Sequence, residues 1–355
     1  MALAAITAAP PVITATTPPA ARASFEEGLA LAQQQRYREA IPYFRAATRQ
    51  DASFAEAFFN LGACHERLDD IAAGMPAYEQ ALTLDPHNER FHELYGLALL
   101  RHGRMDRGVA VLERAAYLAP GKSDILFNLG LAYVAVTQYA LAATCFETVA
   151  GSVSNASSAW YNYGLARLYA GDTGSATRAF QQVDLDAPVA AAAHYHLAVA
   201  ALNAGDPTGA VQAARMAAAL DGSMVETDEV LAQAYERLGD YQAASRVLER
   251  LSVARPSEQT EQALGRVYAA WGAQACAAHK VAVALNRYQQ AARCLPGDAE
   301  VQLHIAQCAI ALERTVLARD APERARGLVV TPAQEERLHA LTVTLERQTS
   351  PSVDK

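Results

Sequence analysis

The sequence predicts an all-α fold, a solenoid of stacked helical hairpins closed by a C-terminal capping helix. Three observations predict it: an apolar motif that recurs about every 34 residues, a turn signal inside most copies, and a hydrophobic fraction of 52% that is rich in Ala. Small side chains at fixed positions allow helices to pack closely. One hairpin cannot bury its apolar face alone, so the copies must stack on one another.

The clearest copy of the motif is residues 159–188, AWYNYGLARLYAGDTGSATRAFQQVDLDAP. Trp160 and Gly164 mark one face of a first helix, and Gly171 breaks that helix. Phe180 marks the apolar face of a second helix, which ends before Pro188. The segment therefore reads as a helix-turn-helix unit.

Further copies before and after this one keep its spacing without insertion. In most first helices a small residue follows a large one and lets the second helix approach: Gly62, Gly96, Gly130, Gly164, Ala198 and Ala232. The second helices carry a large residue that we expect to fill the space between hairpins: Phe44, Tyr78, Leu112, Phe146, Phe180 and Leu248. A proline that disfavours helical geometry then ends several second helices: Pro86, Pro120, Pro188 and Pro256.

The pattern loosens in an eighth hairpin. Leu264 and Gly265 open it, but Tyr288 and Pro296 come late by about seven residues, or about two helical turns. We expect the two helices of this hairpin to share the added length. The solenoid, with its expanded eighth repeat, then spans residues 24–298.

Residues 299–348 are expected to form a degenerate ninth repeat and a capping helix. Thr331 and Gln334 form a Thr-x-x-Gln capping box, with Pro332 at the first helical position. The apolar face of the capping helix comprises Leu338, Leu341 and Leu345. The tail at residues 349–355 is expected to fray.

Residues 1–23 are rich in Ala, Thr and Pro, and we expect them to form a disordered leader. The pairs Pro10-Pro11 and Pro18-Pro19 oppose a continuous helix. A secretory signal is the alternative, because Ala21-Arg22-Ala23 resembles a cleavage site, but the start carries no Lys or Arg and proline breaks its apolar core. We therefore expect a cytoplasmic protein, with export as the alternative.

The overall composition disfavours some classes of partner and of cellular compartment. The formal net charge is −8 and no long basic block occurs, which disfavours a nucleic-acid partner. No apolar run approaches the roughly 18 residues of a membrane-spanning helix, so membrane insertion is not expected. The five cysteines are scattered, odd in number and without a CxxC motif, which favours a reducing compartment.

The repeated small and large positions resemble those of the tetratricopeptide repeat (TPR) family. The resemblance covers residues 21 to about 298, over three quarters of the chain. It implies a right-handed superhelix of TPR hairpins whose first helices line a concave groove that binds peptides or protein segments. Such solenoids offer extended concave surfaces.

The family geometry places three positions of each first helix on this groove. The predicted peptide-binding residues are Phe59, Asn60, Phe127, Asn128, Leu131, Tyr161, Asn162, Leu165 and Tyr195. Their apolar members would accept an amphipathic helix or a short apolar motif. The three asparagines form a partial ladder that can hydrogen-bond the backbone of an extended peptide.

Other roles for these residues stay open. The aromatic side chains can instead pack only against the neighbouring hairpin, and Asn can simply be the usual residue at its position. The leader or a second copy of the chain can also cover the same face.

A catalytic or metal site has little support in the sequence. Cys276 and His279, and His304 and Cys308, have helical spacing, with Cys294 between the pairs, so zinc binding is an alternative. The usual zinc spacings are missing, and no nucleophile motif, phosphate-binding loop or carboxylate pair stands out. We therefore predict no catalytic residue, no metal and no cofactor.

The function predicted from the sequence is a non-enzymatic scaffold or adaptor for protein–protein interaction, which binds a partner peptide or helix in the TPR groove. The alternative is a self-assembling structural protein or chaperone-like assembly factor of a larger complex. A homo-oligomer is compatible with both.

Overall fold

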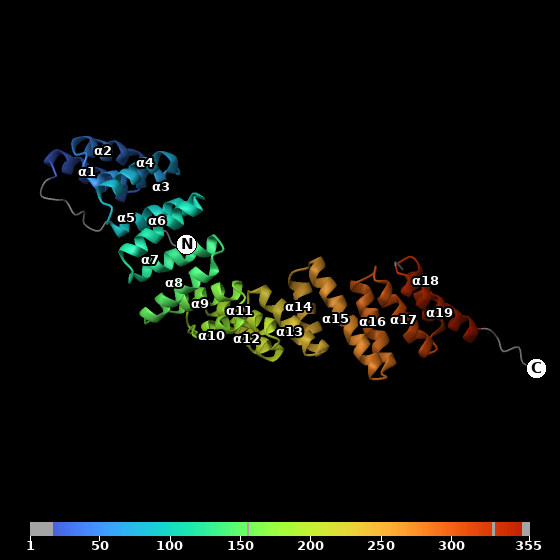
Figure 1. Cartoon of the computed structure of the whole chain (residues 1–355). Helices are drawn as coiled ribbons and strands as arrows, with labels where there is room; N and C mark the ends of the chain where they lie inside the picture. Colours follow the sequence, from blue (N-terminus) through green and yellow to red (C-terminus); the bar gives the residue numbers. More distant parts are fainter. Residues whose placement is uncertain (1–16, 155, 329–330, 350–355) are drawn as a thin grey trace, which may run out of the picture. The chain divides into compact units, whose positions relative to one another are not determined.

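The computed structural model describes residues 17–154, 156–328 and 331–349. These ranges contain nineteen α-helices and no β-strand (Figure 1). The predicted all-α class is therefore confirmed. Contacts between helices divide the chain into two compact units, Met1–Asp172 and Thr173–Lys355.

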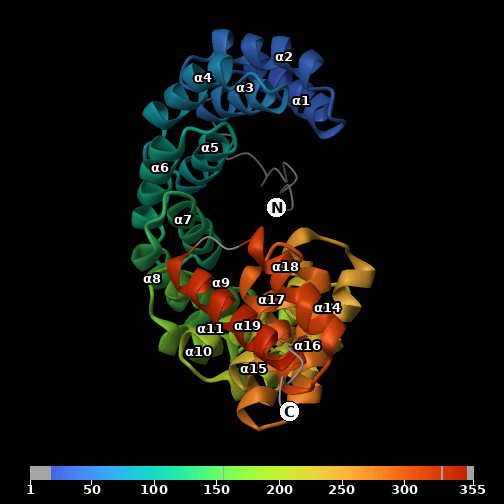
Figure 2. The same ribbon diagram turned by 90° about the vertical axis from the view of Figure 1, so that its right-hand side faces the viewer.

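The first unit consists of four hairpins and one further helix. Its helices are α1 (Pro19–Gln33), α2 (Tyr37–Gln50), α3 (Ala55–Arg67), α4 (Ile71–Leu84), α5 (Glu89–Arg101), α6 (Met105–Leu118), α7 (Ser123–Ala135), α8 (Tyr139–Ser152) and α9 (Ser157–Tyr169). Figure 2 shows α3, α5 and α7 on the inner side of the arc that this unit forms, and α4, α6 and α8 on its outer side. The first helices of the hairpins therefore line the concave side of the unit.

Within each hairpin of this unit, a glycine of the first helix lies against a large residue of the second. A Cβ atom built on these glycines would come within 3.0 Å of the partner side chain. The pairs are Gly28 with Phe44, Gly62 with Tyr78, Gly96 with Leu112, and Gly130 with Phe146. The small residues therefore let the second helix approach in all four hairpins, whereas the large residues, which we expected to fill the space between hairpins, also contact the first helix of their own hairpin.

The second unit continues with hairpins of the same kind. Its helices are α10 (Thr173–Phe180), α11 (Ala190–Asn203), α12 (Pro207–Leu220), α13 (Val225–Arg237), α14 (Tyr241–Ala254), α15 (Glu258–Ala277), α16 (Val281–Cys294), α17 (Ala299–Ala311), α18 (Thr315–Arg326) and α19 (Pro332–Thr349). Helices α11 to α18 pair in sequence order, and one apolar cluster runs through them from Ala198 to Ala321.

The eighth hairpin differs from its prediction in register. Helix α15 has 20 residues and α16 has 14, so the first helix alone contains the added length. Gly272 lies against Tyr288, whereas Gly265 faces Cys294 and Leu295 near the end of α16. The small residue that faces the large residue of the second helix is therefore Gly272 and not Gly265. Seven residues are about two helical turns, so both glycines lie on nearly the same face and the sequence pattern does not separate them.

Helix α1 begins inside the segment that we expect to be a disordered leader. Pro19 occupies the first turn of α1, where a missing backbone N–H costs nothing, and Pro18 before it is extended. Ala21 and Phe25 are buried in the first core cluster. The predicted leader therefore extends too far along the chain, and its residues 1–16, like residues 350–355 of the predicted tail, lie outside the described residues.

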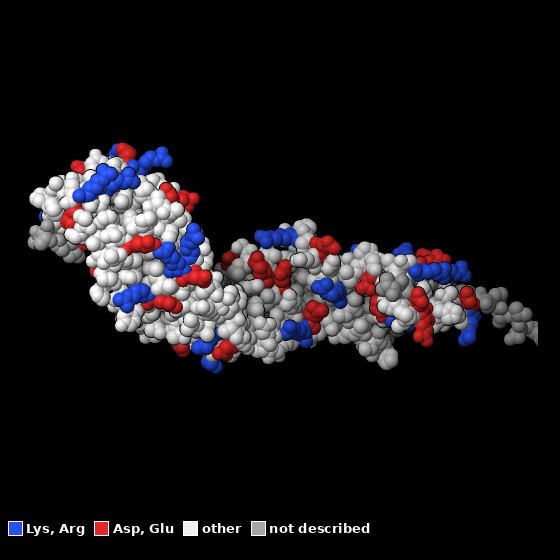
Figure 3. Space-filling model, turned by 45° about the horizontal axis from the view of Figure 1, so that its top comes forward, with Lys and Arg blue, Asp and Glu red and all other residues white. Residues whose placement is uncertain are grey.

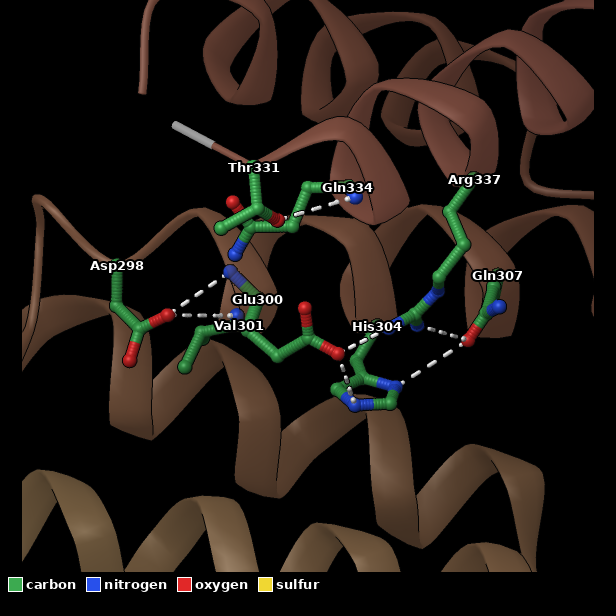
Figure 4. Close-up of polar contacts among 8 residues, drawn as sticks. All are labelled: Asp298, Glu300, Val301, His304, Gln307, Thr331, Gln334 and Arg337. Carbon is green, nitrogen blue, oxygen red and sulfur yellow. Dashed lines mark hydrogen bonds and ion pairs between the residues drawn. The ribbon is translucent and has the colours of Figure 1, made fainter. Parts of the chain in front are cut away.

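Helix α19 packs on the last hairpin as the predicted capping helix. The backbone N–H of Gln334 donates to Thr331 Oγ1 at 3.3 Å, which forms one half of the capping box (Figure 4). Leu338 packs against Leu303 of α17 and Ala325 of α18. The apolar end of the hairpin stack is thereby covered. Across the described ranges, no helix combines the length and hydropathy needed to cross a lipid bilayer.

Candidate functional site

The nine predicted peptide-binding residues fall on four helices, α3, α7, α9 and α11. Eight of them lie on α3, α7 and α9 of the first unit, and Tyr195 lies on α11 of the second unit. The candidate site within the first unit therefore consists of the eight predicted residues on α3, α7 and α9.

Phe59 on α3 is a packing residue. Its side chain is only 7% exposed. The ring stacks on Phe91 with centroids 4.4 Å apart and meets Tyr78 edge-on at 5.0 Å. Phe59 therefore joins the second and third hairpins, which is the role that the sequence leaves open as an alternative to ligand binding.

Phe127 on α7 and Tyr161 on α9 are both half-buried. Phe127 meets Phe146 edge-on at 5.4 Å and packs against an apolar cluster that includes Ala159 of α9. Burial raises the pKa of Tyr161 above its usual value. Leu131 and Leu165, one helical turn further along α7 and α9, are also half-buried. Each of these side chains packs on the unit and leaves part of its surface to solvent.

The three asparagines have defined amide orientations. Asn60 Nδ2 donates to the carbonyl of Glu56 at 2.8 Å, and Asn162 Nδ2 donates to the carbonyl of Ser158 at 2.7 Å. Asn128 Nδ2 instead reaches the previous hairpin and donates to Glu93 Oε1 at 3.0 Å. An Asn amide carries two N–H donors and an acceptor oxygen. Each of these hydrogen bonds therefore orients its amide and uses only one of the two donors.

Tyr195 on α11 of the second unit is half-buried beside a histidine. Its ring centroid lies 4.9 Å from that of His196, and the two rings meet edge-on. The His196 ring also stacks on Phe180, at 5.8 Å. Burial lowers the pKa of His196 below its usual value. Tyr195 therefore belongs to an aromatic group of the second unit.

A buried carboxylate that sequence reasoning missed joins the second and third hairpins. The side chain of Glu66 on α3 is 5% exposed and accepts from Arg101 Nη1 at 2.8 Å. His102 Nε2 lies 3.6 Å from the same carboxylate, and His102 Nδ1 lies 3.4 Å from Asp69. No motif in the sequence indicates this network, because its members come from the ends of two helices in different repeats.

A second kind of contact between hairpins recurs along the chain. The Tyr hydroxyl of a first helix donates to the Glu that follows the large residue of the preceding second helix: Tyr95 to Glu79 at 3.4 Å, Tyr133 to Glu113 at 2.8 Å, and Tyr163 to Glu147 at 3.3 Å. Burial, together with the nearby carboxylate, raises the pKa of Tyr95 to about 12. The recurrence of Glu at this position was a sequence signal for these contacts.

Charges of both signs are interspersed on one face of the molecule. On the face drawn in Figure 3, Lys and Arg side chains lie beside Asp and Glu side chains. Ion pairs within the first unit include Arg107 with Glu79, and Lys122 with Glu89 at 3.7 Å. The face drawn in Figure 3 presents no continuous basic track to a phosphate backbone.

The alternative zinc site is not assembled. His279 lies beyond the end of α15, in a left-handed conformation with φ of 57°, so it does not share a helix face with Cys276. The His304 ring stacks on Tyr288 with centroids 4.8 Å apart. Among the described residues, no three His, Cys, Asp or Glu side chains are arranged to hold a metal ion.

Comparison with family models agrees with the repeat pattern. A model described as "Tetratricopeptide repeat" matches residues 25–89, 66–123, 127–172 and 164–224. A second model of the same description matches residues 229–261. The matched segments together cover more than half of the chain. A search of curated protein sequences found no match.

Solved structures with a similar fold include three TPR-like examples. The C-terminal part of a TPR repeat-containing protein from Cytophaga hutchinsonii is 16% identical, with a TM-score of 0.58 over 68% of this chain and 99% of that chain. Pseudomonas aeruginosa pilF is 22% identical, with a TM-score of 0.46 over 60% and 97%. YrrB, described as a TPR protein with an unusual peptide-binding site, is 18% identical, with a TM-score of 0.47 over 52% and 95%. At these identities the likeness concerns the fold alone.

Proposed function

The chain belongs to the tetratricopeptide repeat family, and from this premise we propose that it is a non-enzymatic scaffold that binds a segment of a partner protein along α7 and α9. The fold suits protein interaction in general, because successive repeats of a solenoid build an extended concave surface. The proposed site is the α7–α9 surface, which consists of Phe127, Asn128, Leu131, Tyr161, Asn162 and Leu165.

The observation that carries the proposal is the same arrangement of residues on two successive first helices. An aromatic residue, an asparagine and a leucine one turn later occur on α7 and again on α9. Phe127 packs in the same apolar cluster as Ala159 and Trp160, so α7 and α9 belong to one packed body. The surface therefore repeats its chemistry at the spacing of the hairpins.

A short peptide with apolar side chains fits this chemistry. Half-buried Leu131 and Leu165 accept apolar groups, and the amides of Asn128 and Asn162 offer an acceptor and a second donor to a peptide backbone. Glu93 and the Ser158 carbonyl already orient these amides. Binding therefore loses less side-chain entropy than binding to freely rotating amides would.

The test uses peptides selected on the full-length protein from a random displayed library. The affinity of a selected peptide is then measured by fluorescence anisotropy for the wild type and for the double variant Tyr161→Ala with Asn162→Ala. We expect binding to weaken about tenfold or more in the double variant, because truncation of a central aromatic anchor commonly costs that much.

The matched control is Tyr117→Ala, which removes a tyrosine from α6, a second helix of the first unit. Tyr117 is 75% exposed, and its ring centroid lies 5.0 Å from the guanidinium of Arg114 on the same helix. This variant should bind the peptide like the wild type. Equal affinity of the wild type and the double variant for the peptide, with helical content unchanged by circular dichroism, would contradict the assignment of the α7–α9 surface.

Light scattering over a range of concentrations separates partner binding from self-assembly, the alternative that the sequence leaves open.

A further inference from the structure

Two cysteine thiols meet in the second unit, away from the α7–α9 surface. Cys276 lies near the end of α15 and Cys308 lies in α17. Their Sγ atoms are 3.7 Å apart, although 32 residues separate them in sequence. Both side chains belong to the apolar cluster that fills the second unit, Cys308 as a core member and Cys276 at its border.

We propose that Cys276 and Cys308 are a redox site that forms a reversible disulfide between the eighth and ninth hairpins. The sulfur atoms of a disulfide are about 2.05 Å apart, so the two thiols need to approach by less than about 2 Å. Rotation about the Cα–Cβ bonds moves a sulfur atom by a distance of this order. The inference is independent of peptide binding and goes beyond the proposed scaffold function.

The two thiols differ in their exposure to solvent, and this gives them different roles in the reaction. Cys276 is partly exposed, whereas Cys308 is only 3% exposed. Burial raises the pKa of Cys308 to about 12, and a thiol rather than a thiolate is a poor nucleophile. Cys276 is therefore the residue that meets an oxidant from solution, and Cys308 is the residue that resolves the product.

The oxidant is a small-molecule disulfide, RSSR. The Cys276 thiolate attacks one sulfur of RSSR, forms a mixed disulfide and releases one RS⁻. Cys308 then gives up its proton, and its sulfur attacks the Cys276 sulfur and displaces the second RS⁻. The two protein thiols lose two electrons and two protons, and RSSR is reduced to two molecules of RSH. Burial makes Cys308 a poor nucleophile. Its attack on the mixed disulfide is intramolecular, however, and this raises the rate of the step.

The bond would fasten the last two hairpins to each other. It closes a loop that contains the whole of α16, and such closure reduces the freedom of the unfolded chain. Cys276 and Cys308 lie on the first helices of successive hairpins, so the bond also fixes the distance between those two helices. The second unit would therefore be stiffer and more stable when it is oxidised.

The experiment treats the full-length folded protein with oxidised glutathione and measures the intact mass. Formation of the disulfide is expected to remove about 2 Da, the mass of two hydrogen atoms. The unfolding temperature of the second unit should rise by about 5 °C and return to its initial value with dithiothreitol. Peptide mapping is carried out in a Cys294→Ser background, because trypsin cleavage after Arg293 and Arg314 would leave Cys294 and Cys308 in one peptide.

Two variants make the test decisive. Cys308→Ala should accumulate a glutathione adduct on Cys276 and form no internal link. Cys276→Ser changes the more exposed position and should show neither the adduct nor the link, which keeps the test valid if Cys308→Ala fails to fold. Oxidation that yields only the adduct in the wild type, or a link from Cys276 to another cysteine, would overturn the proposal.

Discussion

Small residues in the first helices decide how closely the two helices of a hairpin approach. A Cβ on Gly96 would lie 2.7 Å from Leu112 Cγ and 3.2 Å from the carbonyl oxygen of Gly108. In the sixth hairpin the first helix has Ala198 instead, and the facing residue is Ala214, with both fully buried. The added methyl group is thus matched by a smaller partner, which keeps the contact packed.

The substitution Gly130→Ala tests this close approach. The new Cβ would lie 2.8 Å from the ring of Phe146, which is fully buried. We expect the free energy of unfolding of the first unit to fall by about 1–3 kcal/mol, the usual cost of overpacking a core. Urea unfolding followed by circular dichroism measures it.

Gly151→Ala provides the matched control. Gly151 lies in α8, and apart from its chain neighbours and the nearby backbone of its own helix, no atom lies within 4 Å of a Cβ built on it. Alanine favours the helix by up to about 1 kcal/mol over glycine, so this variant should be as stable as the wild type or more stable. Equal stability of Gly130→Ala and the wild type would contradict the packing argument.

Between neighbouring hairpins, polar contacts supplement the apolar core and set the register of one repeat on the next. The Tyr–Glu contacts join a second helix to the first helix that follows it. The Glu66 network joins the ends of α3 and α5, two first helices. A polar contact requires one particular partner, so a shifted stacking of hairpins would leave these groups unpaired.

The substitution Glu66→Ala should lower the unfolding free energy of the first unit by about 2 kcal/mol. Loss of one partner of a buried ion pair commonly costs about 3–5 kcal/mol, but the Arg101 side chain is 38% exposed and can turn to water. Urea unfolding measures the difference. The control is Glu39→Ala, which removes an exposed partner of Arg36. It should leave the midpoint of urea unfolding unchanged, since water screens that ion pair. A loss for Glu66→Ala no larger than for Glu39→Ala would contradict the role of the buried carboxylate.

Helix α19 is held to α17 by a polar group as well as by apolar packing. Arg337 of α19 donates to Glu300 and Gln307 of α17 (Figure 4). His304 lies between them, with Nε2 3.6 Å from Glu300 and Nδ1 3.2 Å from Gln307. Burial lowers the pKa of His304, and the positive charge of Arg337 lowers it further.

This group makes the stability of the second unit sensitive to acid. In the unfolded chain His304 titrates near its usual pKa of about 6.5, whereas the folded protein resists its protonation to lower pH. The unfolded state therefore binds more protons as the pH falls below about 6.5, and stability decreases in that window and not above it. The loss between pH 7.5 and pH 5.5, measured by urea unfolding, should be smaller in His304→Gln than in the wild type.

His194 and His196 of the second unit also have pKa values lowered by burial. Both are present in the wild type and in His304→Gln, so the difference between these two proteins in pH dependence reports on His304. His87→Gln, at an exposed position of the first unit, should leave the pH dependence of the second unit unchanged. A wild type and a His304→Gln variant that lose equal stability would show that His304 does not titrate in this window.

The sequence predicts those features that repeat and misses those that occur once. Small residues such as Gly62 recur at one spacing, and in the structure they let the second helix approach closely, as predicted. The prediction that both helices of the eighth hairpin share its added length was wrong, because Gly265 and Gly272 are two turns apart on nearly the same face and the pattern does not show which helix is longer. Phe59 was placed on the groove by family geometry, but its burial depends on Phe91, which belongs to the next repeat. Contacts such as Glu66 with Arg101 follow no period and were not predictable.

At the scale of the whole chain, each of the two units has apolar clusters of its own. The clusters of the first unit include one around Tyr78 and Leu99. One cluster of the second unit extends from the sixth hairpin to the ninth and includes Leu285. In repeat proteins each repeat contacts only its neighbours, so stability is local and damage to one repeat propagates over a short range.

Two matched substitutions test whether the units unfold separately. Leu99 in α5 is fully buried, and Leu285 in α16 is 2% exposed. Replacement of either by Ala should cost its own unit about 2–5 kcal/mol. Hydrogen exchange followed by mass spectrometry should then show faster exchange in α3 to α6 for Leu99→Ala, with α15 to α18 unchanged, and the reverse for Leu285→Ala. Faster exchange in both units for either variant would mean that the chain unfolds as one cooperative body, and the division at Asp172 would then have no energetic meaning.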